Sequence, residues 1–228
     1  MPPPRQTGTA SQVAEKSNLD RLIEEASAKL AIDEGNAAAW QARAAAYARK
    51  GQHQQALADY GRAIALKPGD AALHYGRAAS LQNLRQYEAA VVAYDEVIRL
   101  APAYVAAFNG RGNCNRALKR HESALVDFDE AVRLDPKFAI GYYNRGLVYN
   151  DLSRAEEAMR DFSAAITADK DYAGAYVQRA LLYEKAGDRE LAIADFRAGL
   201  AARPKFESGP WAHRIARERL TALGAGAP

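Results

Sequence analysis

Cysteine is nearly absent from this chain of 228 residues, which has only Cys114. A single thiol excludes an internal disulfide and a cysteine-based zinc cluster. The four histidines do not suggest another metal site, because they are spread along the chain at positions 53, 74, 121 and 213. We therefore expect neither a metal nor a cofactor.

Strong charge of one sign and long apolar runs are also missing. The net charge is +3, which is too weak to favour nucleic acid or an anionic membrane surface as the partner. No apolar run reaches the roughly 18 to 20 residues that a membrane-spanning helix needs. The first residues, MPPPRQTGTASQVAEK, lack the hydrophobic segment of a secretory signal. We expect a cytoplasmic protein without membrane insertion, or a periplasmic one if a leader was removed.

Aromatic residues are few, at 9%, although hydrophobic residues make up 49% of the chain. Much of the apolar content is alanine, which has the highest helix propensity and lets helices approach closely. Apolar and polar residues do not alternate with period two in the repeated region described next, so no strand is predicted there. These features favour an all-α fold.

A repeat of 34 residues organises the chain. Steps of 34 from Arg111 reach four more arginines, and the same steps from Ala124 and Phe128 reach alanines and aromatic residues. These residues are Arg43, Arg77, Arg145 and Arg179; Ala56, Ala90, Ala158 and Ala192; and Tyr60, Tyr94, Phe162 and Phe196. The repeat defines five units, at residues 37–70, 71–104, 105–138, 139–172 and 173–206.

Each unit predicts two short helices joined by a turn. Apolar residues recur at helical spacing in both halves of a unit, and proline closes most units because it cannot continue a helix. A single helix pair cannot bury both of its faces, so neighbouring pairs must stack. We expect one capping helix at each end, over residues 18–35 and 210–223. Residues 1–17, which are rich in proline and polar side chains, are expected to be disordered.

These residues resemble the tetratricopeptide repeat family, whose 34-residue helix-turn-helix pattern reads W-x-x-L-G-x-x-Y, then A-x-x-x-F, then P. The first unit matches at Trp40, Tyr47, Ala56, Tyr60 and Pro68. Arginine replaces the leucine of the pattern in all five units, and the other departures are His74, Leu81, Asn115 and Lys170. The resemblance implies a right-handed α-solenoid, with first helices that line a concave groove for extended peptides or helices.

The repeated arginines form what we call the arginine ladder: Arg43, Arg77, Arg111, Arg145 and Arg179. An aspartate precedes the second-helix aromatic residue in four units, at Asp59, Asp127, Asp161 and Asp195. The fork of an arginine suits a carboxylate at a helix interface, so we predict four structural ion pairs. The alternative is a column of cations for an anionic ligand. The second unit has Ala93 instead of aspartate, so Arg77 must find another partner or be more exposed.

The stretch FNGRGNCNRA, from Phe108 to Ala117, resembles a ligand site but is predicted to be the first helix of the third unit. A phosphate-binding glycine loop needs a preceding strand, and a P-loop also needs a Gly-Lys-Ser/Thr ending. Its arginine belongs to the ladder, which argues against an RG segment. No histidine is placed to activate Cys114, which we expect to be buried and inert. Because no acid–base or nucleophile–base group is visible, we do not expect an enzyme.

The resemblance also indicates which side chains face the groove. We expect ligand contacts from Gln41, Tyr75, Asn109, Asn113, Arg116, Tyr143, Asn144, Asn150 and Gln178. Asparagine can donate and accept hydrogen bonds to a ligand backbone, and tyrosine offers an apolar ring with a polar tip. Gly76 and Gly110 are expected to leave the groove floor bare. Asn113 and Asn144 match the asparagines of the clamp with which some family members grip a C-terminal carboxylate, but the basic clamp residues are missing, so no such clamp is predicted.

The function we predict is a non-enzymatic scaffold or adaptor that binds a peptide or protein segment in its concave groove. Two alternatives remain. The chain could assemble with itself, through its end helices or by placing its MPPPRQTG tail in the groove. It could also be an RNA-binding helical repeat, although the weak net charge and the alanines at groove positions disfavour this alternative.

Overall fold

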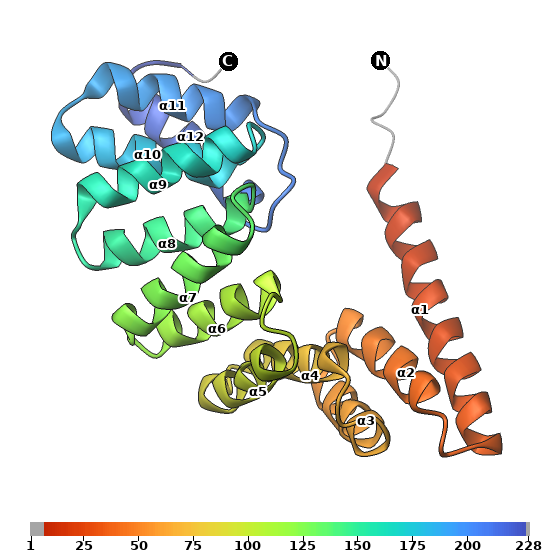
Figure 1. Cartoon of the computed structure of the whole chain (residues 1–228). Helices are drawn as coiled ribbons and strands as arrows, with labels where there is room; N and C mark the ends of the chain where they lie inside the picture. The colour runs from red at the N-terminus through yellow and green to blue at the C-terminus, as the bar shows by residue number, and fades with distance from the viewer. Residues whose placement is uncertain (1–6, 227–228) are drawn as a thin grey trace, which may run out of the picture. The chain divides into compact units, whose positions relative to one another are not determined.

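The computed structural model describes residues 7–226, and over that range its regular secondary structure is entirely α-helical (Figure 1). The helices are α1 (Thr7–Ile32), α2 (Ala37–Arg49), α3 (His53–Leu66), α4 (Ala71–Asn83), α5 (Tyr87–Leu100), α6 (Val105–Ala117), α7 (His121–Leu134), α8 (Ala139–Asp151), α9 (Ala155–Ala168), α10 (Ala173–Ala186), α11 (Arg189–Ala201) and α12 (Gly209–Ala222). The predicted all-α class is confirmed.

The helices begin with the period of the sequence. The first helices of the five units, α2, α4, α6, α8 and α10, begin at residues 37, 71, 105, 139 and 173. The second helices, α3, α5, α7, α9 and α11, begin at residues 53, 87, 121, 155 and 189. Within a unit the two helices pack together, as α2 does with α3 and α8 with α9. Consecutive helix pairs therefore pack as in a helical-repeat solenoid.

The chain divides into two compact units, residues 1–114 and 115–228, with the boundary inside α6. From here on, the first and second unit are these two parts of the chain, and the 34-residue units are called repeats. In the first unit α1 packs on α2 and α3 packs on α4, around a core that includes Ala44, Ala56 and Ala63. In the second unit α7 packs on α8, α9 packs on α10, and α12 covers both α10 and α11. Phe196 and Leu220 are fully buried in this unit.

A left-handed residue forms the turn between the two helices of every repeat. These residues are Gly51, Arg85, Lys119, Ser153 and Gly187, with φ between 59° and 88°. The residue after each one donates its N–H to a carbonyl near the end of the first helix, as Arg120 does to Asn115 at 2.9 Å. This is the bonding of a Schellman-type helix end. Glycine adopts such a φ without steric cost, but the three middle turns use larger residues.

Two glycines within residues 1–114 are packed against tyrosine rings. A Cβ added to Gly76 would lie 2.3 Å from Tyr60 Cζ, and one added to Gly110 would lie 2.3 Å from Tyr94 Cζ. Because each glycine lacks a side chain, the tyrosine ring of the preceding second helix occupies the space where a Cβ would lie. Gly110 is buried, which corrects the expectation of a bare floor there, whereas Gly76 is half-buried.

The N-terminal helix is longer than predicted. α1 begins at Thr7, so residues 7–17 belong to a helix instead of the expected disordered tail, and residues 1–6 lie outside the described range. Leu19, Ala26 and Leu30 are buried on one stripe that docks α1 on α2. Once a docked helix exists, each further residue adds to it without a new nucleation step, and the alanine, glutamine, glutamate and lysine of this stretch are good helix formers.

The C-terminal helix α12 begins at Gly209, one residue before the predicted start, and ends at Ala222. Its residues Ala212, Ala216 and Leu220 are fully buried in the same core cluster as Phe196. The helix therefore closes the apolar face of the last repeat. Within the described range, none of the twelve helices combines the length and the hydropathy that crossing a bilayer demands.

Candidate functional site

The candidate surfaces are the solvent-facing sides of the first helices, and each compact unit is described by itself. We use the name first-helix face for the side formed by α2 and α4 in residues 1–114, and equally for the side formed by α8 and α10 in residues 115–228. On α2, Gln41 is half-buried, and Ala38 and Ala42 are exposed. A cavity of about 280 Å³ opens beside them, between α1 and α2. Its polar side chains come from α1, at Glu25 and Lys29, and from the loop, at Asn36. The rest of its lining is apolar: Leu22, Ala26, Ala38, Ala39 and Ala42.

Tyr75 and Tyr143 occupy the same position in the second and fourth repeats, and both are packed between other rings. The Tyr75 ring stacks on Tyr104 at 5.0 Å and meets Tyr94 edge-on at 5.9 Å. The Tyr143 ring lies 4.9 Å from Tyr172 and 5.9 Å from Phe162. Each predicted groove tyrosine therefore joins its own second helix to the residue that precedes the next first helix.

Tyr143 packs into the core, and its role as a ligand contact stays a prediction. It is only 8% exposed and belongs to the core of the second unit. Burial raises the pKa of its hydroxyl, and interaction with Gln178 opposes that rise. Sequence alone could not distinguish the two roles, because a tyrosine at this repeat position is compatible with either.

The other predicted contacts of the second unit lie near one another on the first helices. Arg116, at the end of α6, donates from Nε to Asp151 Oδ2 of α8 at 2.7 Å. Asn150 is exposed, whereas Asn144 and Gln178 are half-buried. The Arg116 charge is thus already paired at the edge of this face, and Asn150 is the most accessible amide of the set.

Asn109 and Asn113 belong to the part of α6 that lies in the first unit, and both are half-buried. Cys114, the next residue, is a free cysteine that is fully buried among apolar residues of this unit. Among residues 7–226, no group of three or more histidine, cysteine, aspartate or glutamate side chains is placed to hold a metal ion.

Three ladder arginines form bidentate ion pairs with the aspartates expected from the sequence. In each case Nε lies 2.7 Å from Asp Oδ2, and Nη2 lies 2.6 to 2.9 Å from Oδ1. The pairs are Arg43–Asp59, Arg145–Asp161 and Arg179–Asp195. Hydrogen bonding to Asp161 raises the pKa of Arg145, and the same cause acts on the other two arginines. Arg111 lies in the compact unit of residues 1–114 and Asp127 in that of residues 115–228, so the fourth pair stays a prediction.

The ladder arginines have a second set of partners that the sequence reasoning missed. From Nη1, Arg43 donates to Ser27 at 3.1 Å, Arg111 to Asp95 at 2.6 Å, Arg145 to Asp129 at 2.7 Å and Arg179 to Ser163 at 2.8 Å. All four partners lie 16 residues before the arginine, just as the predicted aspartates lie 16 residues after it. Where both partners are present, one guanidinium bridges three helices. The equal spacing in both directions was the available signal.

Arg77 has no such support. The residues 16 positions before and after it are Gly61 and Ala93, and Arg77 is exposed. The sequence offered two outcomes for this arginine, another partner or greater exposure, and the structure shows greater exposure.

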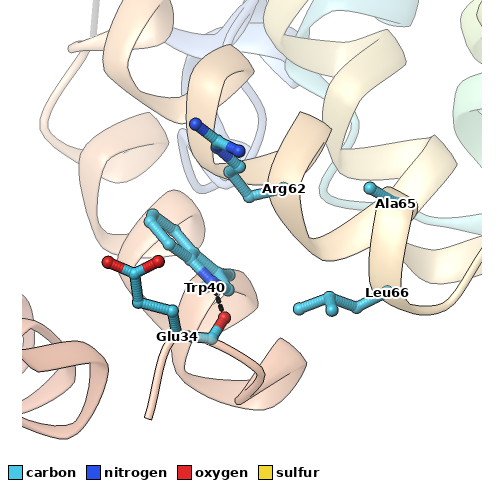
Figure 2. Close-up of a pocket in the computed structure, with 5 residues that line it drawn as sticks. All are labelled: Glu34, Trp40, Arg62, Ala65 and Leu66. Carbon is cyan, nitrogen blue, oxygen red and sulfur yellow. Dashed lines mark hydrogen bonds between the residues drawn. The ribbon is translucent and has the colours of Figure 1, made fainter. Parts of the chain in front are cut away.

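A second cavity, of about 190 Å³, lies beside Trp40 (Figure 2). Trp40 Nε1 donates to the Glu34 carbonyl at 2.9 Å, and Arg43 covers the ring at 4.8 Å. Figure 2 shows Arg62 above the indole and Leu66 across the pocket from it. The indole N–H therefore already has a hydrogen-bond partner within the protein, and the cavity is lined by both charged and apolar side chains.

The repeated helix pairs define a class of protein, the helical-repeat scaffolds. Models described as "Tetratricopeptide repeat" match residues 75–137, 122–174 and 173–206, and one described as "TPR repeat" matches residues 44–84. These matches run from residue 44 to residue 206. The chain belongs to the tetratricopeptide repeat family.

Solved structures of similar fold agree with that assignment. YrrB, described as a TPR protein with an unusual peptide-binding site, is 19% identical with a TM-score of 0.63, covering 87% of this chain and 99% of YrrB. MamA from Desulfovibrio magneticus is 22% identical with a TM-score of 0.66, covering 75% of this chain and 97% of that one. A chain of the Cut9–Hcn1 hetero-tetramer is 20% identical with a TM-score of 0.70, covering 88% and 40%. No protein of curated function matches the sequence.

Proposed function

We propose that the first-helix face of this scaffold binds an extended peptide or a segment of a protein partner. A role in protein–protein interaction follows from membership of the tetratricopeptide repeat family. The finer assignment rests mainly on the cavity between α1 and α2, where exposed alanines form a shallow apolar floor next to charged and amide groups. The YrrB structure supports the proposal by analogy, because that protein of the same fold is described as having a peptide-binding site.

The chemistry of this face suits a ligand that offers both side chains and backbone. Ala38 and Ala42 leave room for an apolar side chain, since a methyl group is all that each one places on the surface. Gln41 on α2 carries an amide that can donate to and accept from a peptide backbone. Both signs of charge occur beside the cavity, at Glu25 and Lys29, so the ligand need not be strongly acidic or basic.

A matched pair of substitutions tests this assignment. Ala42 on α2 and Ala58 on α3 are both exposed alanines of the first repeat, one on the first helix and one on the second. We expect Ala42→Arg to fill the cavity and remove the proteins that wild type captures from a native lysate, while Ala58→Arg leaves capture unchanged. Circular dichroism would establish equal helicity. Capture that survives Ala42→Arg, or that is lost equally in both variants, would exclude this face as the binding surface.

A further inference from the structure

The arginine ladder holds each guanidinium in the same way in four repeats. A carboxylate or hydroxyl 16 residues earlier accepts from Nη1, at 2.6 to 3.1 Å. In three of these repeats the aspartate 16 residues later also accepts two hydrogen bonds from the fork. An aromatic ring three residues earlier lies under each of these arginines, at 4.8 to 6.0 Å. Their side chains are consequently only 18 to 22% exposed.

The second repeat keeps the arginine and removes each of these supports. Around Arg77, Gly61 replaces the earlier acceptor, Ala93 replaces the later aspartate, and His74 replaces the aromatic ring. The His74 ring is engaged elsewhere, since Nε2 lies 2.9 Å from the Pro68 carbonyl. The charge remains, because an arginine stays protonated at any physiological pH.

No internal carboxylate takes the place of the missing ones. On the two helices that flank Arg77, three acidic residues are held by other arginines. Asp59 of α3 pairs with Arg43, and on α5 Asp95 pairs with Arg111 and Glu96 pairs with Arg99. Within the part of the chain that the structure describes, Arg77 forms no ion pair.

The space that the earlier acceptor fills in other repeats is open beside Arg77. Gly61 is exposed, and a Cβ added to it would meet nothing within 4 Å. At Ala93 a methyl group stands where Asp59, Asp161 and Asp195 carry their carboxylates. The guanidinium of Arg77, a planar fork with five N–H donors, is therefore exposed to solvent. At the same position in another repeat, the guanidinium of Arg145 binds a carboxylate on each of two sides.

We propose that Arg77 binds an aspartate or glutamate side chain of a partner protein, which completes the ladder from outside. This site lies on the second-helix side of the repeats, between α3 and α5, because the ladder partners belong to second helices. It is a contact separate from the first-helix face, and the partner is recognised by one carboxylate placed opposite the arginine fork.

The test uses a displayed library of random 12-residue peptides selected on the full chain. We expect a class of selected peptides with an invariant aspartate or glutamate. For a synthetic member of that class, Arg77→Gln should weaken binding roughly tenfold or more, the range of a charge-assisted hydrogen bond. Changing the peptide acid to its amide should have the same effect, and the two changes together should cost no more than either alone.

Gly61 provides a control that leaves Arg77 in place. Gly61→Asp puts a carboxylate 16 residues before Arg77, as Asp95 stands before Arg111, and should block the same peptides by an internal ion pair. Gly61→Asn has nearly the same shape without charge and should bind them within about twofold of wild type.

Three results would overturn the proposal: a selection without an Arg77-dependent acidic position, equal loss in Gly61→Asp and Gly61→Asn, or additive effects of Arg77→Gln and the peptide amide. If the selection yields only peptides that lose binding with Ala42→Arg and not with Arg77→Gln, the first-helix proposal stands and this one is refuted.

Discussion

Replacing Gly110 by alanine should destabilise the protein even though alanine is the better helix former. The added Cβ would lie 2.3 Å from Tyr94 Cζ and 2.5 Å from its hydroxyl oxygen, whereas carbon atoms in contact sit about 3.5 to 4.0 Å apart. The ring must therefore move by roughly 1 Å or more. Tyr94 cannot swing out freely, because it is 1% exposed and its hydroxyl donates to Gln82 at 2.8 Å.

The magnitude follows from two opposing terms. Overpacking a well-filled core costs about 1–3 kcal/mol, and the helix propensity of alanine over glycine returns up to about 1 kcal/mol. We expect Gly110→Ala to lower the free energy of unfolding by about 1–2 kcal/mol. The same change at exposed Gly61, where nothing lies within 4 Å, should raise it by about 0.5–1 kcal/mol.

Urea unfolding followed by circular dichroism would measure both variants against wild type. A second variant, Tyr94→Leu, shortens the side chain that meets the new methyl group. In that background Gly110→Ala should cost less than it does alone, since the colliding ring is gone. The packing argument is refuted if Gly110→Ala is as stable as Gly61→Ala, or if its cost is unchanged by Tyr94→Leu.

Three further predictions use the turns, the ladder and a surface pair. Lys119→Gly should stabilise the protein by up to about 1 kcal/mol, because φ at this turn is 61°, and a fall in urea midpoint would contradict it. Arg145→Met should cost about 2–4 kcal/mol by leaving a buried aspartate unpaired, whereas exposed Arg77→Met should stay within about 0.5 kcal/mol; equal unfolding curves would disprove the difference. A hydrogen bond from Lys205 lowers the pKa of Asp169, so the stability it adds is present above the ordinary aspartate pKa and is lost as pH falls through the lowered value. Lys205→Met should raise the Asp169 pKa toward its ordinary value in an NMR titration, and an unmoved pKa would exclude this cause.

The repeat boundaries could be predicted from the sequence because every repeat has the same pattern of helix-forming, apolar and turn residues. Every first helix begins where the 34-residue step places it, as at residues 71 and 105. The ladder pairs were predictable for the same reason: a constant spacing of 16 residues, as between Arg43 and Asp59, sets the same two positions opposite each other in successive repeats.

Other features depended on contacts that a residue type does not reveal. Gly110 could face a ligand or a ring, and its neighbour Tyr94 decides in favour of the ring. Tyr143 could line a groove or fill a core, and the positions of Tyr172 and Phe162 decide that it is buried. The length of α1 was likewise missed, since proline and polar residues near the start outweighed its helix formers.

The sequence by itself determined the all-α class, the number of repeats and the identity of the residues that pair within a repeat. Those properties follow from helical periodicity and from the constant spacing between paired residues. Both are local features of the sequence, and they recur in each repeat. Only the tertiary structure decided which small residues admit a neighbouring ring and which arginine keeps a free face. Packing between successive helices is a relation between side chains of different repeats. The sequence therefore shows that Ala93 replaces an aspartate, but only the structure shows that Arg77 is exposed and that the space beside Gly61 is open.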